Sequence, residues 1–452
     1  MQIPENIKFL SAFDIGQLLH KKKMCPVDLV NFYYNEISSF KENSPYTVLT
    51  KKRAIIEAGL SKKRILEENT LSPLDGVPIA WKDLFDFKGL QTQGGSKLLE
   101  NNKPAQHDAH TVSLAKSAGL IQLGKTSTVE FALGGLGTNN NFAMPENAIM
   151  KDCPRVPGGS SAGSGVALAN NLCAASIGTD TGGSVRIPSA WNKLIGLKTS
   201  FGKVSLDGVL PLSSSLDTVG PLTKSMKDTS LLYSILSNQP YFQFNNISLN
   251  NTKILVVKGI PWKDCDINIE NVCEKAIEKI SNAGVKIIEK KVSAIEEMHE
   301  ILSEHGTTVA YEGYLQWKHL IEKHRDLMDI NVLNRMLQGK LMKTDSIKIV
   351  KDAQKNLSQK LYYSLNDYDC ILMPTIPILP PKIKDVTSNE KLYDKYNMLA
   401  LRNTRIGNVL PMCSITLPCP GDLPIGLMLS MPIGKDKKLI NLAETIFNII
   451  KQ

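Results

Sequence analysis

The chain has 452 residues, of which 42% are hydrophobic and 21% are charged, and its formal net charge at pH 7 is +9. Its eight cysteines include no C-x-x-C pair, and its lysine pairs are not interleaved with aromatic residues. These features argue against a structural zinc site and a nucleic-acid surface, and they fit reduced, buried thiols.

Targeting signals are not expected in this sequence. No apolar run approaches the roughly 18 residues of a membrane-spanning helix, and the first nine residues lack the apolar segment of a secretory signal. We therefore expect a cytoplasmic protein with no membrane partner, no direct nucleic-acid partner, no metal and no cofactor.

Apolar periodicity predicts short buried strands that alternate with helices along the chain. Ser11 fits an N-cap and Pro26 fits a first helical turn. The expected helices are two within 12–41, then 54–68, 109–118, 162–169, 272–283, most of 294–365, 391–409 and 437–451. The expected strands are the stretch before Lys82, then 120–123, 172–177, 194–198, 254–257, 285–288, 370–374, 412–417 and 426–431. This alternation predicts an α/β fold whose sheet is covered by helices on both faces.

Two glycine-rich turns each place a serine directly after a glycine pair. The first is Gly158-Gly159-Ser160-Ser161, and the second runs from Gly178 to Ser184 through Thr181, Gly182 and Gly183. Glycine allows positive φ and close approach of a ligand to the backbone. Backbone N–H groups that converge at such turns can form an oxyanion hole. Glycine-serine turns also occur as plain loops without a catalytic role.

A lysine follows the apolar stretch that ends the 73–83 segment. Lys82 comes directly after Ile79-Ala80-Trp81, so partial burial of its ammonium group is expected there. Burial disfavours the charged form of lysine, lowers its pKa and makes it available as a base. A surface lysine at a strand end would show the same local pattern.

Together, Lys82, Ser160 and Ser184 lie in motifs that resemble, in the same order, those of the amidase signature family. The resemblance covers most of residues 1–235 and returns at Pro424-Ile425-Gly426-Leu427. It implies that Ser184 is the nucleophile, Ser160 the proton relay and Lys82 the base. One departure from the family pattern is Ala162, where the family commonly has glycine.

The resemblance also carries expectations about architecture and substrate. It implies a single amidase domain over 1–452, a large mixed, mostly parallel twisted sheet, and a cis peptide bond at the first serine. Backbone N–H groups of Thr181, Gly182, Gly183 and Ser184 are expected to form the oxyanion hole.

The substrate is expected to be a small-molecule amide, held by the variable, mainly helical region of 294–365 and the loop 130–137. No charge match to a substrate is readable there, and the assembly state stays open, a homodimer included.

Rival catalytic residues are less consistent with their sequence context. Ser161 fits a G-x-S-x-G elbow, but that motif needs an apolar strand before it, and 151–157 holds two prolines and three charges. The triple serine 213–215 lacks a preceding glycine pair, which favours a loop there. Four of the seven histidines fall within 294–365, at spacings that do not place pairs on one helix face.

Two other roles remain open beside that of a free-standing amidohydrolase. The N-terminal half also resembles the amidase component of the glutamyl-tRNA amidotransferase, whereas 206–212 and 410–418 look closer to free-standing bacterial amidases. A scaffold protein without chemistry is disfavoured because Lys82, Ser160 and Ser184 are all present.

Overall fold

The computed structural model describes residues 3–452, and its described strands form one sheet of eleven strands. The strands are β1 (Tyr46–Leu49), β2 (Pro78–Lys82), β3 (Ile121–Thr126), β4 (Ala175–Thr179), β5 (Ile195–Lys198), β6 (Val219–Thr223), β7 (Lys253–Lys258), β8 (Lys286–Lys291), β9 (Cys370–Pro374), β10 (Met412–Pro418) and β11 (Gly426–Pro432). Their order across the sheet is β1-β3-β2-β4-β6-β5-β10-β11-β9-β7-β8.

The expectation of a mostly parallel sheet is wrong. The parallel pairs are β2–β3, β2–β4, β7–β8 and β7–β9. The other six pairs are antiparallel. They comprise β1–β3 and all five neighbouring pairs in the central run of the sheet, β4-β6-β5-β10-β11-β9. The physical reason lies in the connections: β5 leads to β6, and β10 to β11, without an α-helix between them. A parallel pairing needs a long crossover, usually a helix.

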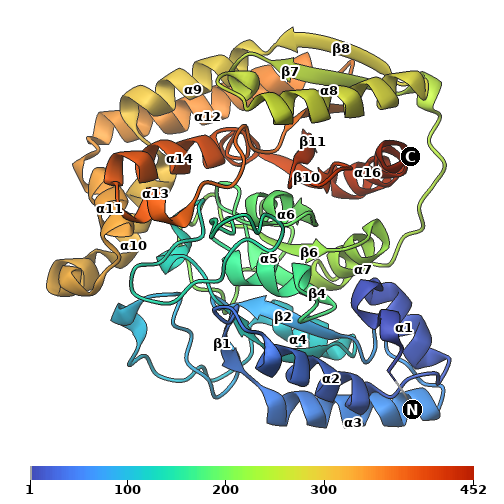
Figure 1. Cartoon of the computed structure of the whole chain (residues 1–452). Helices are drawn as coiled ribbons and strands as arrows, with labels where there is room; N and C mark the ends of the chain where they lie inside the picture. The colour runs from blue at the N-terminus through green and yellow to red at the C-terminus, as the bar shows by residue number, and fades with distance from the viewer. Residues whose placement is uncertain (1–2) are drawn as a thin grey trace.

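Helices account for most of the remaining chain. The α-helices are α1 (Ala12–His20), α2 (Pro26–Ser39), α3 (Lys51–Leu66), α4 (His110–Ser117), α5 (Ala162–Ala169), α6 (Arg186–Trp191), α7 (Met226–Leu236), α8 (Ile267–Asn282), α9 (Ser293–His305), α10 (Thr308–His324), α11 (Ile330–Leu341), α12 (Thr344–Ser364), α13 (Ile383–Thr387), α14 (Glu390–Arg402), α15 (Ile406–Val409) and α16 (Asp436–Lys451). Figure 1 shows β7, β8, α8, α9 and α12 at one end of the molecule and β1, β2, α2 and α3 at the other.

The central strands are covered on both faces. Every residue of β2, β3, β4, β5, β6 and β9 is buried. Because successive side chains of a strand point to opposite faces, complete burial means that both faces of the sheet are covered. The α/β class and the covered sheet are therefore as predicted, and they place the ends of β2 and β4 in the interior.

Two departures from the expected elements bear on the site. Gly220-Pro221 is typical of turns, so the sequence predicts no strand at β6. The strand forms there because Gly220 has no side chain: a Cβ at this position would lie 1.8 Å from the Leu197 carbonyl oxygen. The single helix expected over 391–409 is instead α14 and α15. The break between these two helices brings Thr404 to the second glycine-rich turn, where its Oγ1 donates to the Gly182 carbonyl at 2.7 Å.

Candidate active site

Lys82 is the last residue of β2, and its side chain is fully buried. Its Nζ donates hydrogen bonds to Ser160 Oγ at 2.6 Å and to Thr179 Oγ1 at 2.8 Å. Burial lowers the pKa of Lys82 to about 7, although the nearby charges of Asp217 and Asp180 act in the opposite direction. At neutral pH a large fraction of this amine is therefore unprotonated and able to accept a proton.

The first glycine-rich turn fixes Ser160 against this amine. The peptide bond between Gly159 and Ser160 is cis, as the resemblance implies. The Gly159 N–H donates to the Gly135 carbonyl at 2.8 Å, which ties the turn to the loop 130–137. α5 begins at Ala162, where the backbone is helical and φ is not positive. The alanine that replaces the family's usual glycine is therefore accommodated without backbone strain.

The second glycine-rich turn carries Ser184, which is 3% exposed. The Ser161 N–H donates to the Ser184 carbonyl at 3.2 Å, so the two turns are joined directly. Gly183 has φ of +138°, and a Cβ there would lie 2.1 Å from Thr404 Oγ1. Only glycine fits this position, because both its backbone conformation and the neighbouring side chain exclude a larger residue.

The backbone N–H groups of this turn divide into two sets. The Gly183 N–H donates to Asp180 Oδ1 at 2.8 Å and is already satisfied. Within residues 3–452, the N–H groups of Thr181, Gly182 and Ser184 have no protein acceptor. The donors available to an incoming anion are thus three of the four expected ones.

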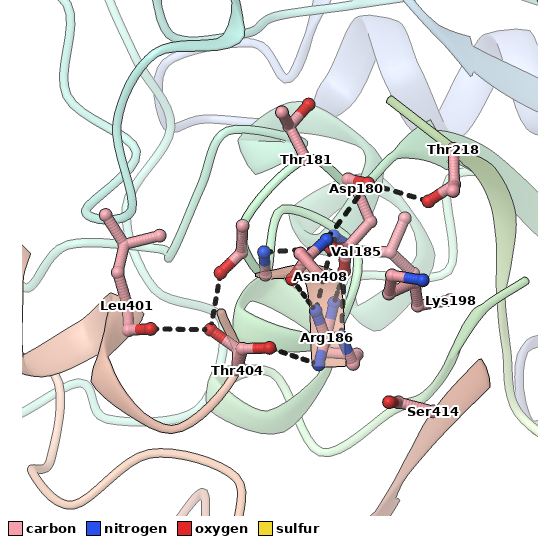
Figure 2. Close-up of polar contacts among 12 residues, drawn as sticks. Asp180, Thr181, Val185, Arg186, Lys198, Thr218, Leu401, Thr404, Asn408 and Ser414 are labelled. Atoms are coloured by element: carbon pink, nitrogen blue, oxygen red, sulfur yellow. Dashed lines mark hydrogen bonds and ion pairs between the residues drawn. The ribbon is translucent and has the colours of Figure 1, made fainter. Parts of the chain in front are cut away.

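A buried carboxylate holds the second turn in shape (Figure 2). Asp180 accepts hydrogen bonds from Arg186 Nη2 at 2.9 Å and Nε at 3.0 Å, and from Asn408 Nδ2 at 2.9 Å. Burial raises the pKa of Asp180, but the charge and hydrogen bonds of Arg186 outweigh burial and hold that pKa well below its usual range. Asp180 is therefore a fixed anion that organises the turn.

A cavity opens over Ser184. Its lining comes from the loop 130–137, the second turn, the segment before β6, the helical region of α9–α11 and the residues around α15: Ala132, Leu133, Gly134, Thr181, Gly182, Ser184, Leu212, Leu216, Leu302, Thr307, Thr308, Val309, Arg335, Leu401, Arg405 and Val409. Residues of 130–137 and of 294–365, the two segments expected to shape a substrate pocket, both contribute to this lining. The lining includes two arginines, although no charge match was readable from the sequence.

The rival nucleophiles, Ser161 and the triple serine 213–215, form hydrogen bonds with other groups of the protein. Ser161 Oγ is buried, donates to the Thr179 carbonyl at 3.3 Å and does not line the cavity. Ser213 Oγ donates to Glu312 Oε2 at 2.7 Å. In the described part of the chain, no group of three or more His, Cys, Asp or Glu side chains is placed to hold a metal ion.

Sequence reasoning missed several residues around the site. Thr179 and Asp180 stand inside the second motif, so their position next to Ser184 was a usable signal. Asp217 follows the triple serine and accepts from Thr181 Oγ1 at 2.5 Å. Arg335 and Arg405 lie in stretches with no motif, and no local pattern marks them.

Comparisons with known proteins assign this chain to a family. The family model named Amidase matches residues 28–440. The deaminase of 2-amino-5-chloromuconic acid from Comamonas testosteroni is 32% identical, over 99% of this chain and 97% of the relative. The chain belongs to the amidase family.

Relatives within the amidase family include enzymes with different roles. A glutamyl-tRNA(Gln) amidotransferase subunit from Sulfolobus acidocaldarius is 31% identical, over 97% of this chain and 98% of the relative. A solved structure described as an amidase superposes with a TM-score of 0.86 at 26% identity, covering 98% of this chain and 100% of the other. As an amidase-family member, the chain is a hydrolase that acts on C–N bonds.

Among the described residues of this amidase, no helix is both long enough and apolar enough to cross a membrane.

Proposed function

We propose that this amidase hydrolyses a linear carboxylic amide through a serine acyl-enzyme, with Ser184 as nucleophile, Ser160 as relay and Lys82 as base. The observation that carries the proposal is the 2.6 Å contact between Lys82 Nζ and Ser160 Oγ in a fully buried setting. A serine hydroxyl is a poor nucleophile at neutral pH and needs an adjacent base. A buried amine with a pKa of about 7 meets that need.

The contacts of Lys82 support a role for Ser160 as relay. Within residues 3–452, Lys82 Nζ contacts Ser160 and Thr179 and makes no hydrogen bond with Ser184. A proton that leaves Ser184 therefore needs an intermediary to reach the amine. We assign this role to Ser160, because its Oγ contacts Nζ and its turn is joined to the Ser184 turn by the bond from the Ser161 N–H. When Lys82 is neutral, the Ser160 hydroxyl donates to Nζ and can accept a proton from Ser184 in the same step.

The reaction then proceeds in two halves. Ser184 Oγ forms an ester bond with the amide carbon, and the proton from Lys82 passes through Ser160 to the leaving nitrogen as the C–N bond breaks. Water then attacks the ester carbon, and its proton passes through Ser160 to Lys82. The bond between the acyl carbon and Ser184 Oγ breaks, the proton returns through Ser160 to Oγ, and the acid is released. Hydrogen-bond donors aimed at the developing oxyanion typically contribute about 3 kcal/mol each. Thr181, Gly182 and Ser184 offer the N–H groups for this role, and Gly183 shapes the turn.

The glutaminase component of a glutamyl-tRNA amidotransferase is the second candidate, because relatives with that name match at similar identity. Glutamine carries an α-ammonium group, which a binding site normally pairs with a carboxylate. No Asp or Glu is among the described residues that line the cavity over Ser184. This lining favours a free-standing amidohydrolase acting on a small molecule, with the whole chain as one catalytic domain.

The test is ammonia release by the purified chain alone across glutamine, short aliphatic amides, aryl amides and ureido compounds, with Ser184→Ala as the control. We expect release from at least one small amide without any partner and its loss in Ser184→Ala. Activity that requires partner proteins and charged tRNA would transfer the assignment to the amidotransferase. Equal release by both forms would overturn the mechanism.

A further inference from the structure

A carboxylate that the proposed catalytic step does not use is buried close to the first glycine-rich turn. Glu130 opens the loop 130–137, and its side chain is fully buried. Its Oε1 accepts a hydrogen bond from Ser96 Oγ at 2.6 Å, and its Oε2 accepts one from the Asp329 N–H at 2.7 Å. Each oxygen of this carboxylate is therefore held by a donor from a different segment of the chain.

The carboxylate and its two donors depend on one another. Burial raises the pKa of Glu130 to about 7, whereas the hydrogen bonds from Ser96 and Asp329 act in the opposite direction. Among the described residues, the Asp329 N–H has no acceptor other than Glu130. A buried donor that loses its acceptor is costly, so removal of the carboxylate would leave an unpaired group on the far side of the contact.

This contact joins the loop 130–137 to the helical wall of the cavity. Asp329 is the N-cap residue of α11, and α11 contributes to the lining of the cavity over Ser184. Asp329 Oδ2 in turn accepts a hydrogen bond from the Asn140 N–H at 2.6 Å. The start of α11 and the segment 130–140 are therefore tied together at two points, one of which is Glu130.

The backbone directly after Glu130 adopts an unfavourable conformation. Phe131 has φ of +49° and Ala132 has φ of +61°, both in the left-handed region that residues with a side chain rarely adopt. Such conformations persist only where the surrounding structure holds them. The Phe131 ring stacks on Trp317 of α10 at 4.5 Å between ring centroids, and Glu130 fixes the preceding residue.

The same loop is bonded to the turn that carries the proposed relay. The Val129 N–H, one residue before Glu130, donates to the Ser160 carbonyl at 3.3 Å. The Gly159 N–H donates to the Gly135 carbonyl at 2.8 Å. A shift of the loop would therefore move the turn, and with it the hydroxyl that contacts the base.

We propose that Glu130 is a positioning residue that holds the loop 130–137 in its strained conformation and thereby sets Ser160 against Lys82. This inference rests on the proposed function, because it adds a residue to the same catalytic site. Glu130 does not line the cavity, so its effect on hydrolysis passes through the loop. Displacement of a reacting group by about 1 Å can reduce the rate by about 100-fold.

The test uses Glu130→Met, which removes both acceptor oxygens and keeps the length of the side chain. Labelling of Ser184 by a fluorophosphonate should slow by about 10- to 100-fold. Hydrogen–deuterium exchange of the backbone amides should become faster in 129–137 and 158–161. Glu130→Gln can still accept from the Asp329 N–H and can donate to Ser96 Oγ, so it should restore most of the labelling rate.

Glu57→Met is the matched control for this variant. Glu57 is also a buried carboxylate that accepts from a backbone N–H, that of Gln122 at 2.8 Å, and it does not line the cavity. Its loss should lower the free energy of unfolding without slowing the labelling of Ser184 or changing exchange in 158–161.

Labelling and exchange together separate this inference from the proposed function. Slower labelling and faster exchange in Glu130→Met, with recovery in Glu130→Gln and neither change in Glu57→Met, support the positioning role. Labelling of Glu130→Met at the wild-type rate, or equal slowing in Glu57→Met, overturns that role and leaves the serine mechanism intact. No labelling of the wild type overturns the proposed function; unchanged exchange in 158–161 of Glu130→Met would then overturn the positioning role as well.

Discussion

Lys82 Nζ lies 2.6 Å from Ser160 Oγ, and both side chains are fully buried. The two residues are 78 positions apart in the chain, and the end of β2 and the first glycine-rich turn bring them together. Water is excluded from this contact, so the amine loses its hydration and its pKa falls to about 7. The contact makes the lysine a base that operates at neutral pH.

The pH dependence of hydrolysis should follow the titration of Lys82. The base must be neutral, so kcat/KM for a neutral amide is expected to rise with pH, about tenfold per unit below a pKa of about 7, and to level off above it. A neutral substrate is required so that substrate ionisation does not add its own pKa. A profile that stays flat between about pH 5.5 and pH 9, or that falls with increasing pH, would contradict the role of Lys82.

Thr179 should support the amine without taking part in bond making. Thr179→Val removes the 2.8 Å hydrogen bond from Lys82 Nζ and keeps the shape of the side chain. Loss of one such bond to a charged or titrating group should lower kcat/KM by about tenfold or more and shift the apparent pKa of the pH profile. Thr416→Val is the matched control, because Thr416 is a buried threonine of β10 whose Oγ1 bonds to Thr375 Oγ1. Equal effects of both variants on the pH profile would exclude a specific role for Thr179.

Asp180 should be essential for the stability of the second turn. Asp180→Asn replaces an acceptor by an amide donor facing Arg186 and leaves that buried guanidinium without its counter-charge. Breaking one side of a buried ion pair costs about 3–5 kcal/mol in the free energy of unfolding. Urea denaturation measures this loss, and activity should fall with it because the same carboxylate holds the Gly183 N–H.

A surface pair of the same residue types provides the control for Asp180. Asp152 pairs with Arg155 at 2.8 Å, and the Asp152 side chain is 54% exposed. Asp152→Asn should change the free energy of unfolding by about 0–1 kcal/mol, because water screens exposed pairs. A similar loss in both variants would show that the buried Asp180–Arg186 pair contributes no more to the free energy of unfolding than the exposed pair.

The sequence allowed prediction of those site residues that stand in contiguous motifs. Ser160 and Ser184 follow glycine pairs and Lys82 follows an apolar strand, and the resemblance of these three motifs to the amidase signature family gave the residues their expected roles. Arg335 and Arg405 could not be found in this way. Their meaning depends on a cavity assembled from α11 and the break between α14 and α15, and no local spacing encodes that assembly.

The fold was predictable in class but not in strand direction. Buried strands and amphipathic helices are local patterns, whereas direction depends on which strands become neighbours. β4 and β5 are joined through α6, as in a parallel unit, yet each pairs with β6 instead and runs antiparallel to it. This arrangement depends on β6, which the sequence does not indicate because Gly220 and Pro221 are typical of turns.

Acylation of Ser184 is the central claim, and trapping of that serine tests it most directly. A fluorophosphonate reagent captures an activated serine as a stable adduct, which intact mass spectrometry and peptide mapping locate. We expect one adduct on Ser184 in the wild-type chain and no adduct in Ser184→Ala or in Lys82→Met, with all three chains folded. An adduct on Ser161 or Ser213, or labelling of Ser184 that is as fast in Lys82→Met as in the wild type, would contradict the Ser184–Ser160–Lys82 mechanism.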